Sequence, residues 1–190
     1  MDTAAYILTG GKSSRFGRDK ALFDFQGQPM ALVVAGRVAE VFDQVSLVGD
    51  PQRYSKLGLR VIPDQIANAG PLAGIAAALE DSTAQHTLVV ACDMPFLRVS
   101  FLERLFEKAA DSNARALVPI GIDGRPQPLC SVYGASAAET IQLALAAGVR
   151  KITDAFDRLD TVYLHPADYS DIDPEGKSFR NVNTLADLQI

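Results

Sequence analysis

The 190-residue sequence predicts an α/β fold in which helices cover both faces of a mostly parallel sheet. Short apolar runs at residues 4–9, 45–48 and 87–91 have the length and composition of buried strands. Segments with helical spacing of apolar residues, such as 30–42, alternate with these strands. Hydrophobic residues make up 48% of the chain, which suits an ordinary globular core. We therefore expect a single Rossmann-like, three-layer domain over residues 1–190.

The first half of the chain alternates strands and helices. In chain order we expect a strand at 4–9, a short extended excursion at 21–29, a helix at 30–42, strands at 45–48 and 60–62, a helix that opens at Gly70-Pro71, and the strand at 87–91. Pro29 suits the start of a helix because its φ is already close to the helical value. This alternation is the reason to expect parallel strands joined by crossovers.

The second half of the chain is expected to add an antiparallel excursion to the sheet. We expect a helix at 100–109, a strand at 116–119, a hairpin turn at 121–124, a strand at 127–133, and a helix at 135–147 that ends at Gly148. Ser100, followed by Glu103 three residues later, predicts a capping box at the start of the first of these helices.

Composition and charge exclude several classes of protein. The formal net charge of −5 argues against a nucleic-acid binder, which would present a basic face. No apolar run approaches membrane-spanning length, and Asp2 replaces the basic start of a secretory signal. Cys92 and Cys130 have no metal-ligand spacing and are expected to be reduced, buried thiols. His86 and His165 have no nucleophile or carboxylate at recognisable spacing, which argues against a hydrolytic triad. We expect a cytoplasmic monomer.

A glycine-rich basic loop follows the first strand. Within the net acidic chain, one acidic residue, Asp19, accompanies the basic residues Lys12, Arg15, Arg18 and Lys20. Glycine and serine amides beside Arg and Lys make a site for a polyanion, and phosphate is the expected one. The spacing matches neither the P-loop of nucleoside triphosphatases nor the G-x-G-x-x-G of dinucleotide-binding proteins. The alternative is a solvated Gly-Ser loop with chance charges.

An aspartate follows the most apolar strand directly, in the segment Cys92-Asp93-Met94-Pro95. Ligands of open parallel sheets bind beyond the carboxyl ends of the strands, so Asp93 and the basic loop should share one edge of the sheet. An aspartate there can hold Mg²⁺, which prefers oxygen ligands and bridges carboxylates to phosphates. It can equally cap the next turn. The residues alone leave both interpretations open.

Other polar residues have weaker signals. Asp64 follows the strand at 60–62 and is by itself a turn carboxylate. Arg150 and Lys151 form a basic helix end, which the helix macrodipole favours. Asn181 and Asn183 would point to one face of an extended segment and Val182 to the other. Two amides on one face could hold a phosphate or a metal-bound water, but a turn and a helix cap explain them as well.

Four separated motifs resemble, in the right order, nucleotidyltransferases that activate a phosphorylated substrate with a nucleoside triphosphate. The resemblance is closest to the molybdenum cofactor guanylyltransferase (MobA) family. The motifs are the loop from Leu8-Thr9-Gly10-Gly11 to Asp19-Lys20, the segment from Pro63-Asp64 to Gly70-Pro71-Leu72-Ala73-Gly74, Cys92-Asp93-Met94-Pro95, and Phe179-Arg180-Asn181-Val182-Asn183-Thr184. Thr9 and Phe16 stand where the family usually has Ala and Met, which keeps a small and an apolar side chain.

The resemblance implies a fold of the nucleotide-diphospho-sugar transferase type and a reaction. GMP would pass from GTP to the terminal phosphate of molybdopterin, giving molybdopterin guanine dinucleotide and pyrophosphate, with Mg²⁺ as cofactor. The implied nucleotide-binding residues are Leu8, Thr9, Gly10, Gly11, Lys20, Asp64 and Asp93. The implied catalytic residues are Arg15, Lys20 and Asp93, with Asp93 as metal ligand, and the implied acceptor-binding residues are Arg150, Lys151, Asn181 and Asn183.

The resemblance also defines the alternatives. A cytidylyltransferase for the same cofactor and a sugar-phosphate nucleotidyltransferase use the same chemistry, and a non-catalytic GTP-binding module would share the loop. Asp50 stands where the family has an asparagine, so its contact with the nucleotide stays open. Arg125-Pro126-Gln127-Pro128-Leu129 resembles a segment near the second substrate but is by itself an ordinary hairpin. The resemblance admits molybdoenzyme apoproteins and their chaperones as partners.

Overall fold

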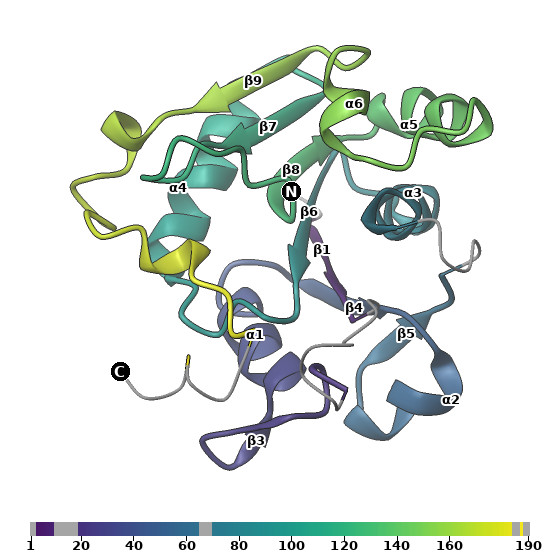
Figure 1. Ribbon diagram of the computed structural model, residues 1–190, viewed down its shortest axis with the longest axis vertical. Helices are drawn as coiled ribbons and strands as arrows, with labels where there is room; N and C mark the ends of the chain where they lie inside the picture. Colours follow the sequence, from purple (N-terminus) through teal and green to yellow (C-terminus); the bar gives the residue numbers. More distant parts are fainter. Residues whose placement is uncertain (1–2, 10–18, 65–69, 184–186, 188–190) are drawn as a thin grey trace.

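The computed structural model describes residues 3–9, 19–64, 70–183 and 187, which form a seven-stranded sheet flanked by helices (Figure 1). Its strands are β1 (Ala4–Leu8), β4 (Gln44–Val48), β5 (Arg60–Ile62), β6 (His86–Ala91), β7 (Ala116–Pro119), β8 (Cys130–Gly134) and β9 (Thr161–Leu164), in the spatial order β5-β4-β1-β6-β8-β7-β9. The helices are α1 (Met30–Val38), α2 (Pro51–Tyr54), α3 (Pro71–Asp81), α4 (Val99–Ala110), α5 (Ala137–Ala146) and α6 (Thr153–Phe156), and β2 (Asp24–Phe25) pairs with β3 (Gln28–Pro29).

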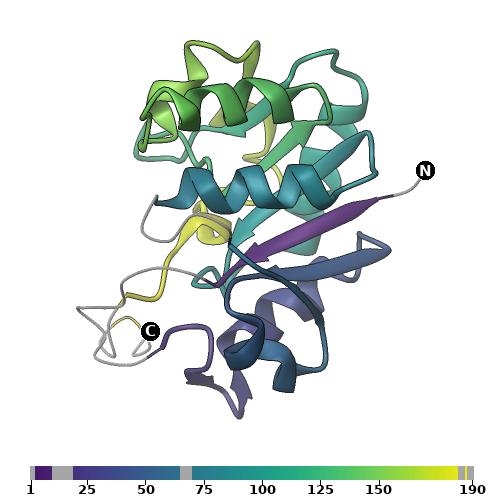
Figure 2. The same ribbon diagram turned by 90° about the vertical axis from the view of Figure 1, so that its right-hand side faces the viewer.

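β1 is covered on both faces, as its uninterrupted apolar sequence predicts. Ala5 and Ile7 belong to a core cluster with residues of α1 and α4. Tyr6 and Leu8 point the other way, into a cluster with residues of α3 and α5. Successive strand residues alternate between faces, so one short strand contributes to both layers. Figure 2 shows α3 and α5 on one side of the sheet, and the cluster with α1 and α4 covers the other, which confirms the predicted three-layer α/β architecture.

The second half of the sheet is partly antiparallel, as predicted. β1 pairs in parallel with β4 and β6, whereas β8 runs antiparallel to both β6 and β7. β8 begins at Cys130 and not at residue 127. Pro128 lacks the N–H that a paired strand needs, and the Cys130 N–H instead closes a turn onto the Gln127 carbonyl. The expected strand at 127–133 was therefore placed correctly but begun too early.

Two helix predictions were wrong in detail. The helix expected at 30–42 ends at Val38, and the chain then continues in turns, with Phe42 N–H donating to the Val38 carbonyl. Phe42 is nevertheless buried, so the apolar spacing that suggested a longer helix continues through a turn. The helix expected at 135–147 runs from Ala137 to Ala146, and Gly148 follows with a positive φ of 84°.

The capping box expected at Ser100 and Glu103 is absent. α4 begins at Val99 with Arg98 as its N-cap, so Ser100 lies inside the helix. Arg98 is held by tertiary contacts that the local sequence does not show: its N–H donates to Ser178 Oγ, and its guanidinium donates to the Ile172 carbonyl. The start of α4 is thus fixed by the C-terminal part of the chain.

Among the α-helices and strands of the described residues, α2, α6 and β9 were not predicted. The two helices have four residues each, too few to show apolar periodicity. β9 lies at the edge of the sheet, and Val162 and Tyr163 are exposed there, so it lacks a buried-strand pattern.

The contacts of the two cysteines and the two histidines indicate structural roles. Cys92 and Cys130 are buried and unpaired, as expected of reduced thiols, and burial raises the pKa of both. His86 packs edge-on against Phe106, and burial lowers its pKa. His165 precedes a short 3-10 turn, where its N–H donates to Asp168. Within the described ranges, no helix has the length and apolar character needed to cross a membrane.

A buried carboxylate anchors the C-terminal segment of the described chain. Asp173 is fully buried and accepts hydrogen bonds from the N–H groups of Lys177 and Ser178, each at 2.9 Å. Arg98 Nε lies 3.4 Å from the same carboxylate. Because a buried charge needs several partners, this arrangement fixes the turn from which the chain continues to residues 181–183.

We expect Asp173→Ala to lower the free energy of unfolding by about 3 kcal/mol, because it removes a buried ion pair and two charge-assisted hydrogen bonds. Urea denaturation followed by circular dichroism measures the loss. The matched control is Asp171→Ala, because Asp171 pairs with Arg104 but its side chain is 63% exposed. The control should cost only a small fraction of that loss, because exposed ion pairs contribute little to stability. Equal losses for the two variants would contradict an anchoring role for Asp173.

Candidate functional site

Three polar residues from distant parts of the sequence meet at one edge of the sheet. Lys20 Nζ donates to Asp93 Oδ2 at 3.0 Å and to Asn183 Oδ1 at 2.6 Å. The side chains of Lys20 and Asp93 are 20% and 18% exposed, so both are largely sheltered yet reachable from solvent. We call these three residues the Lys20 cluster. All three were predicted site residues, and the predicted proximity of Asp93 to the basic loop is seen at Lys20.

The pairing of the strands explains why Asp93 lies there. β1 and β6 run in parallel with Leu8 opposite Ala91, and the Cys92 N–H donates to the Leu8 carbonyl. Both strands therefore end at the same edge, where parallel sheets bind ligands. Asp93 is the second residue beyond β6.

The burial of Val182 positions the next residue, Asn183, at the Lys20 cluster. Val182 is fully buried in a small cluster with Phe25 and Met30, and its N–H donates to the Asp93 carbonyl at 2.9 Å. Asn181 and Asn183, on either side, are exposed. The expected alternation of the two asparagines with Val182 is thus present, although the segment is not a strand.

Leu8 and Thr9 direct their side chains into the protein. Leu8 packs so closely against α3 that a Cβ at Gly74 would lie 3.1 Å from Leu8 Cδ2. Thr9 Oγ1 donates to the Val48 carbonyl at 2.7 Å. Both side chains therefore take part in the packing of the protein interior. At these two positions, only backbone groups could contact a nucleotide. Gly10, Gly11 and Arg15 lie outside the described residues.

In the basic pair after α5, Arg150 makes its hydrogen bonds away from the Lys20 cluster. Arg150 Nη1 donates to the carbonyls of Leu145 and Val149, so the guanidinium caps the C-terminal end of α5. Lys151 is exposed. The Arg150 carbonyl lies 3.3 Å from where a Cβ at Gly70 would be, which places the pair beside the start of α3. Asp64, two residues beyond β5, is exposed.

A second network, which the sequence did not suggest, lies next to the Lys20 cluster. Asp19 accepts hydrogen bonds from the Ala21 N–H, the Tyr54 hydroxyl and Arg53 Nη1. Tyr54 closes α2, and Asp50 caps that helix by accepting from the Gln52 N–H. The pair Asp50-Pro51 is a typical helix start and could have indicated α2 from the sequence.

The Lys20 cluster is suited to neutralising charge and positioning a substrate, because it offers a cation and a carboxylate. Burial, and secondarily the nearby Asp93 and Asp19 carboxylates, raise the pKa of the Cys92 thiol far above its usual range, so it is no nucleophile near neutral pH. Among the described residues no three His, Cys, Asp or Glu side chains group into a metal cage. A single accessible carboxylate suits Mg²⁺, which keeps most of its waters and takes one or two carboxylates plus substrate phosphates.

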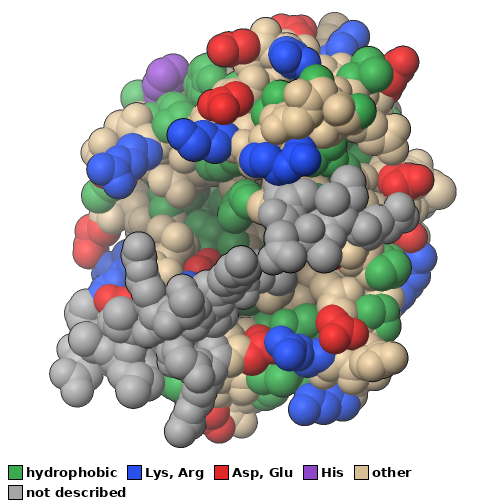
Figure 3. Space-filling view, turned by 45° about the vertical axis from the view of Figure 1, so that its right-hand side comes forward, with side chains coloured by type: hydrophobic (Ala, Val, Ile, Leu, Met, Phe, Trp, Pro, Cys, Tyr) green, Lys and Arg blue, Asp and Glu red, His purple; other side chains and the backbone are tan. Residues whose placement is uncertain are grey.

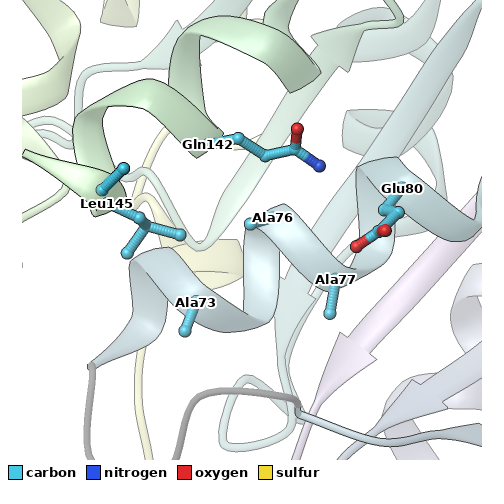
Figure 4. A pocket seen from close by; sticks show the side chains of 7 residues that line it. Ala73, Ala76, Ala77, Glu80, Gln142 and Leu145 are labelled. Atoms are coloured by element: carbon cyan, nitrogen blue, oxygen red, sulfur yellow. The ribbon is translucent and has the colours of Figure 1, made fainter.

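The described part of the surface includes two hollows of different character. Figure 3 shows Lys and Arg side chains gathered above a hollow with partly hydrophobic walls. A separate cavity of about 260 Å³ lies between α3 and α5, lined by Ala73, Ala76, Ala77, Glu80, Gln142, Leu145 and Ala146 (Figure 4). Its walls carry one ionisable group, Glu80, so it offers little for chemistry.

The sequence of this chain is similar to those of known nucleotidyltransferases. The sequence model described as the MobA-like NTP transferase domain matches residues 5–162. A probable molybdenum cofactor guanylyltransferase of Pelotomaculum thermopropionicum is 35% identical over 99% of this chain and 91% of its own length. The molybdenum cofactor guanylyltransferase of Ralstonia nicotianae is 34% identical, over 99% of this chain and 95% of its own.

Solved structures give the same result. Molybdopterin-guanine dinucleotide biosynthesis protein A from Archaeoglobus fulgidus superimposes with a TM-score of 0.85 at 31% identity, covering 98% of this chain and 95% of that one. The 2-C-methyl-D-erythritol 4-phosphate cytidylyltransferase of Thermus thermophilus, at 16% identity and a TM-score of 0.71, covers 99% of this chain and 96% of its own and shares the fold. The sequence match over most of the chain and the relatives above 30% identity establish that this chain belongs to the MobA-like NTP transferase family.

Proposed function

We propose that this protein transfers GMP from GTP to the terminal phosphate of molybdopterin, forming molybdopterin guanine dinucleotide. The observation that carries the proposal is the Lys20 cluster, in which a cation, a carboxylate and an amide meet at the carboxyl edge of the sheet. Relatives that match almost the whole chain are named for this reaction.

The reaction balances without a covalent enzyme intermediate. An oxygen of the molybdopterin phosphate forms a bond to the α-phosphorus of GTP, and the bond from that phosphorus to the β-phosphate oxygen breaks. Pyrophosphate leaves with the electron pair. Catalysis then depends on positioning and on neutralising phosphate charge, which preorganised groups do well in a sheltered site.

The residues of the chain divide these tasks. Asp93 would hold Mg²⁺, which when bound would offset charge on the triphosphate. Lys20 would release Asp93 and Asn183 and donate to the leaving pyrophosphate. Asn183, freed from Lys20, would turn its amide to the acceptor phosphate. The proposed roles of Arg15, Gly10 and Gly11 rest on the family resemblance alone.

The geometry changes the roles that we propose for Arg150 and Lys151 in binding the acceptor phosphate. The Arg150 guanidinium donates to carbonyls at the end of α5. It would bind the acceptor phosphate only if it gave up those hydrogen bonds for bonds to the phosphate. Lys151 is exposed, and its ammonium would supply the charge that meets the acceptor phosphate. Lysine acts as a point charge, without the bidentate fork of arginine.

The nucleotide preference tests the proposed function. With Mg²⁺ and molybdopterin, GTP should release pyrophosphate with a kcat/KM at least about tenfold above those of CTP, ATP and UTP, equivalent to about 1.4 kcal/mol. A coupled pyrophosphate assay measures the rates, and omission of molybdopterin is the control. Preference for CTP would make the protein a cytidylyltransferase. Binding of GTP without acceptor-dependent pyrophosphate would make it a binding module.

The metal role of Asp93 predicts how Mg²⁺ affects GTP affinity. Asp93→Asn keeps the size of the side chain but removes the charge that attracts the cation. Calorimetric titration with GTP should show that Mg²⁺ tightens binding to the parent by about tenfold or more, and to the Asn variant by less than about twofold.

The control for this titration is Asp171→Asn, which removes a carboxylate paired with Arg104 on the exposed surface. It should keep the full Mg²⁺ effect on GTP affinity. An Asp93→Asn variant with the same Mg²⁺ dependence as the parent would exclude Asp93 as the ligand.

A further inference from the structure

Tyr54 connects the chain on both sides of residues 10–18. It is 4% exposed, and its hydroxyl lies 2.9 Å from Asp19 Oδ2 and 3.3 Å from the Thr9 carbonyl oxygen, to both of which it can donate. Thr9 ends the β1 side and Asp19 begins the segment that carries Lys20. One buried hydroxyl therefore contacts both segments.

Asp19 is held on both of its oxygens. Oδ1 accepts from the Ala21 N–H at 3.0 Å, and Oδ2 accepts from Tyr54 and from Arg53 Nη1 at 3.1 Å. Lys20 lies between Asp19 and Ala21, so the backbone on both sides of Lys20 is tied to this carboxylate. The direction in which Lys20 leaves the backbone, toward Asp93, follows from that arrangement.

Close packing beneath Tyr54 leaves little room for adjustment. A Cβ at Gly49 would lie 2.2 Å from Thr9 Oγ1 and 2.8 Å from Tyr54 Cε2, so glycine is required there by the approach of these two residues. Thr9 is also bonded to the Val48 carbonyl. The ends of β1 and β4 and the ring of Tyr54 thus pack as one rigid unit.

We propose that Tyr54 is a positioning residue for nucleotidyl transfer, which holds Asp19 and the Thr9 carbonyl and thereby sets Lys20 within reach of Asp93 and the triphosphate. This rests on the proposed function. Tyr54 does not itself touch the substrate. Burial first, and the Asp19 carboxylate second, raise the pKa of Tyr54 to about 12, so its hydroxyl stays protonated and keeps its role as donor throughout the neutral range.

The chain contains a matched control for Tyr54. Tyr6 is also 4% exposed, its hydroxyl donates to an aspartate, Asp81, at 2.7 Å, and its pKa is likewise raised to about 12. That aspartate lies at the end of α3 and pairs with Arg60, with no bond to the Lys20 cluster in the described part of the chain. Tyr6→Phe and Tyr54→Phe should therefore cost similar stability, each lowering the melting temperature by about 2–4 °C.

Activity should separate the two variants. We expect Tyr54→Phe to lower the kcat of pyrophosphate release by about tenfold, with a smaller change in KM for GTP, because Lys20 is proposed to act on the leaving group. Tyr6→Phe should stay within about twofold of the parent. If both variants lose activity equally, Tyr54 has a structural role only and the proposal fails.

A double-mutant cycle with Lys20→Ala identifies the route of the effect. If Tyr54 acts through Lys20, the tenfold effect of Tyr54→Phe should shrink to less than about twofold once Lys20 is alanine. The same cycle is measured on the affinity for inorganic pyrophosphate with Mg²⁺, which needs neither guanine nor molybdopterin. Additive effects in both cycles would overturn the proposal. Coupling in the binding cycle without turnover of GTP would retain Tyr54 and reject the proposed function.

Discussion

The parallel pairing of β1 with its two neighbours is the constraint on which the rest of the site depends. Leu8 lies opposite Val48 on one side and Ala91 on the other, so three strands end at the same level. The segments that leave these ends carry Lys20, Tyr54 and Asp93. A one-residue slip in register would turn each strand over and bury the wrong side chains, so the hydrophobic layers that stabilise the fold also align the polar residues.

Much of the fold could be predicted from the sequence because the central strands are uniformly apolar. β5 and β7 were predicted with their observed bounds, and β1, β4 and β6 to within one residue at either end. The elements that were missed are short, as α2 and α6 are, or exposed at the edge of the sheet, as β9 is. The wrong capping box at Ser100 has a different cause: Arg98 is held by Ile172, Asp173 and Ser178, and these contacts outweigh a local capping signal.

The candidate site could be predicted in part. Strand order and the rule for parallel sheets place Asp93 and the basic loop together, and the structure brings Lys20 to Asp93. The guanine and molybdopterin assignments came from resemblance, because no pattern of residue types specifies a base. Tyr54 could not be found from sequence, since its importance comes from Asp19, 35 positions away, through a turn of four residues. For Arg150 the local sequence predicted a basic helix end, and its guanidinium does bond the C-terminal end of α5, whereas the acceptor-binding role implied by the resemblance stays a prediction.

We propose that Lys20 and Asp93, which pair with each other here, separate when GTP binds. Asp93 would then hold the metal ion, and Lys20 would bind the phosphates that leave. A crystal structure with GTP and Mn²⁺, which stands in for Mg²⁺ and has an anomalous signal, tests it most directly. We expect an anomalous peak between Asp93 and the triphosphate, with the Lys20 ammonium moved from Asp93 to a phosphate oxygen. A peak away from Asp93, with the Lys20–Asp93 ion pair intact beside bound GTP, would contradict it.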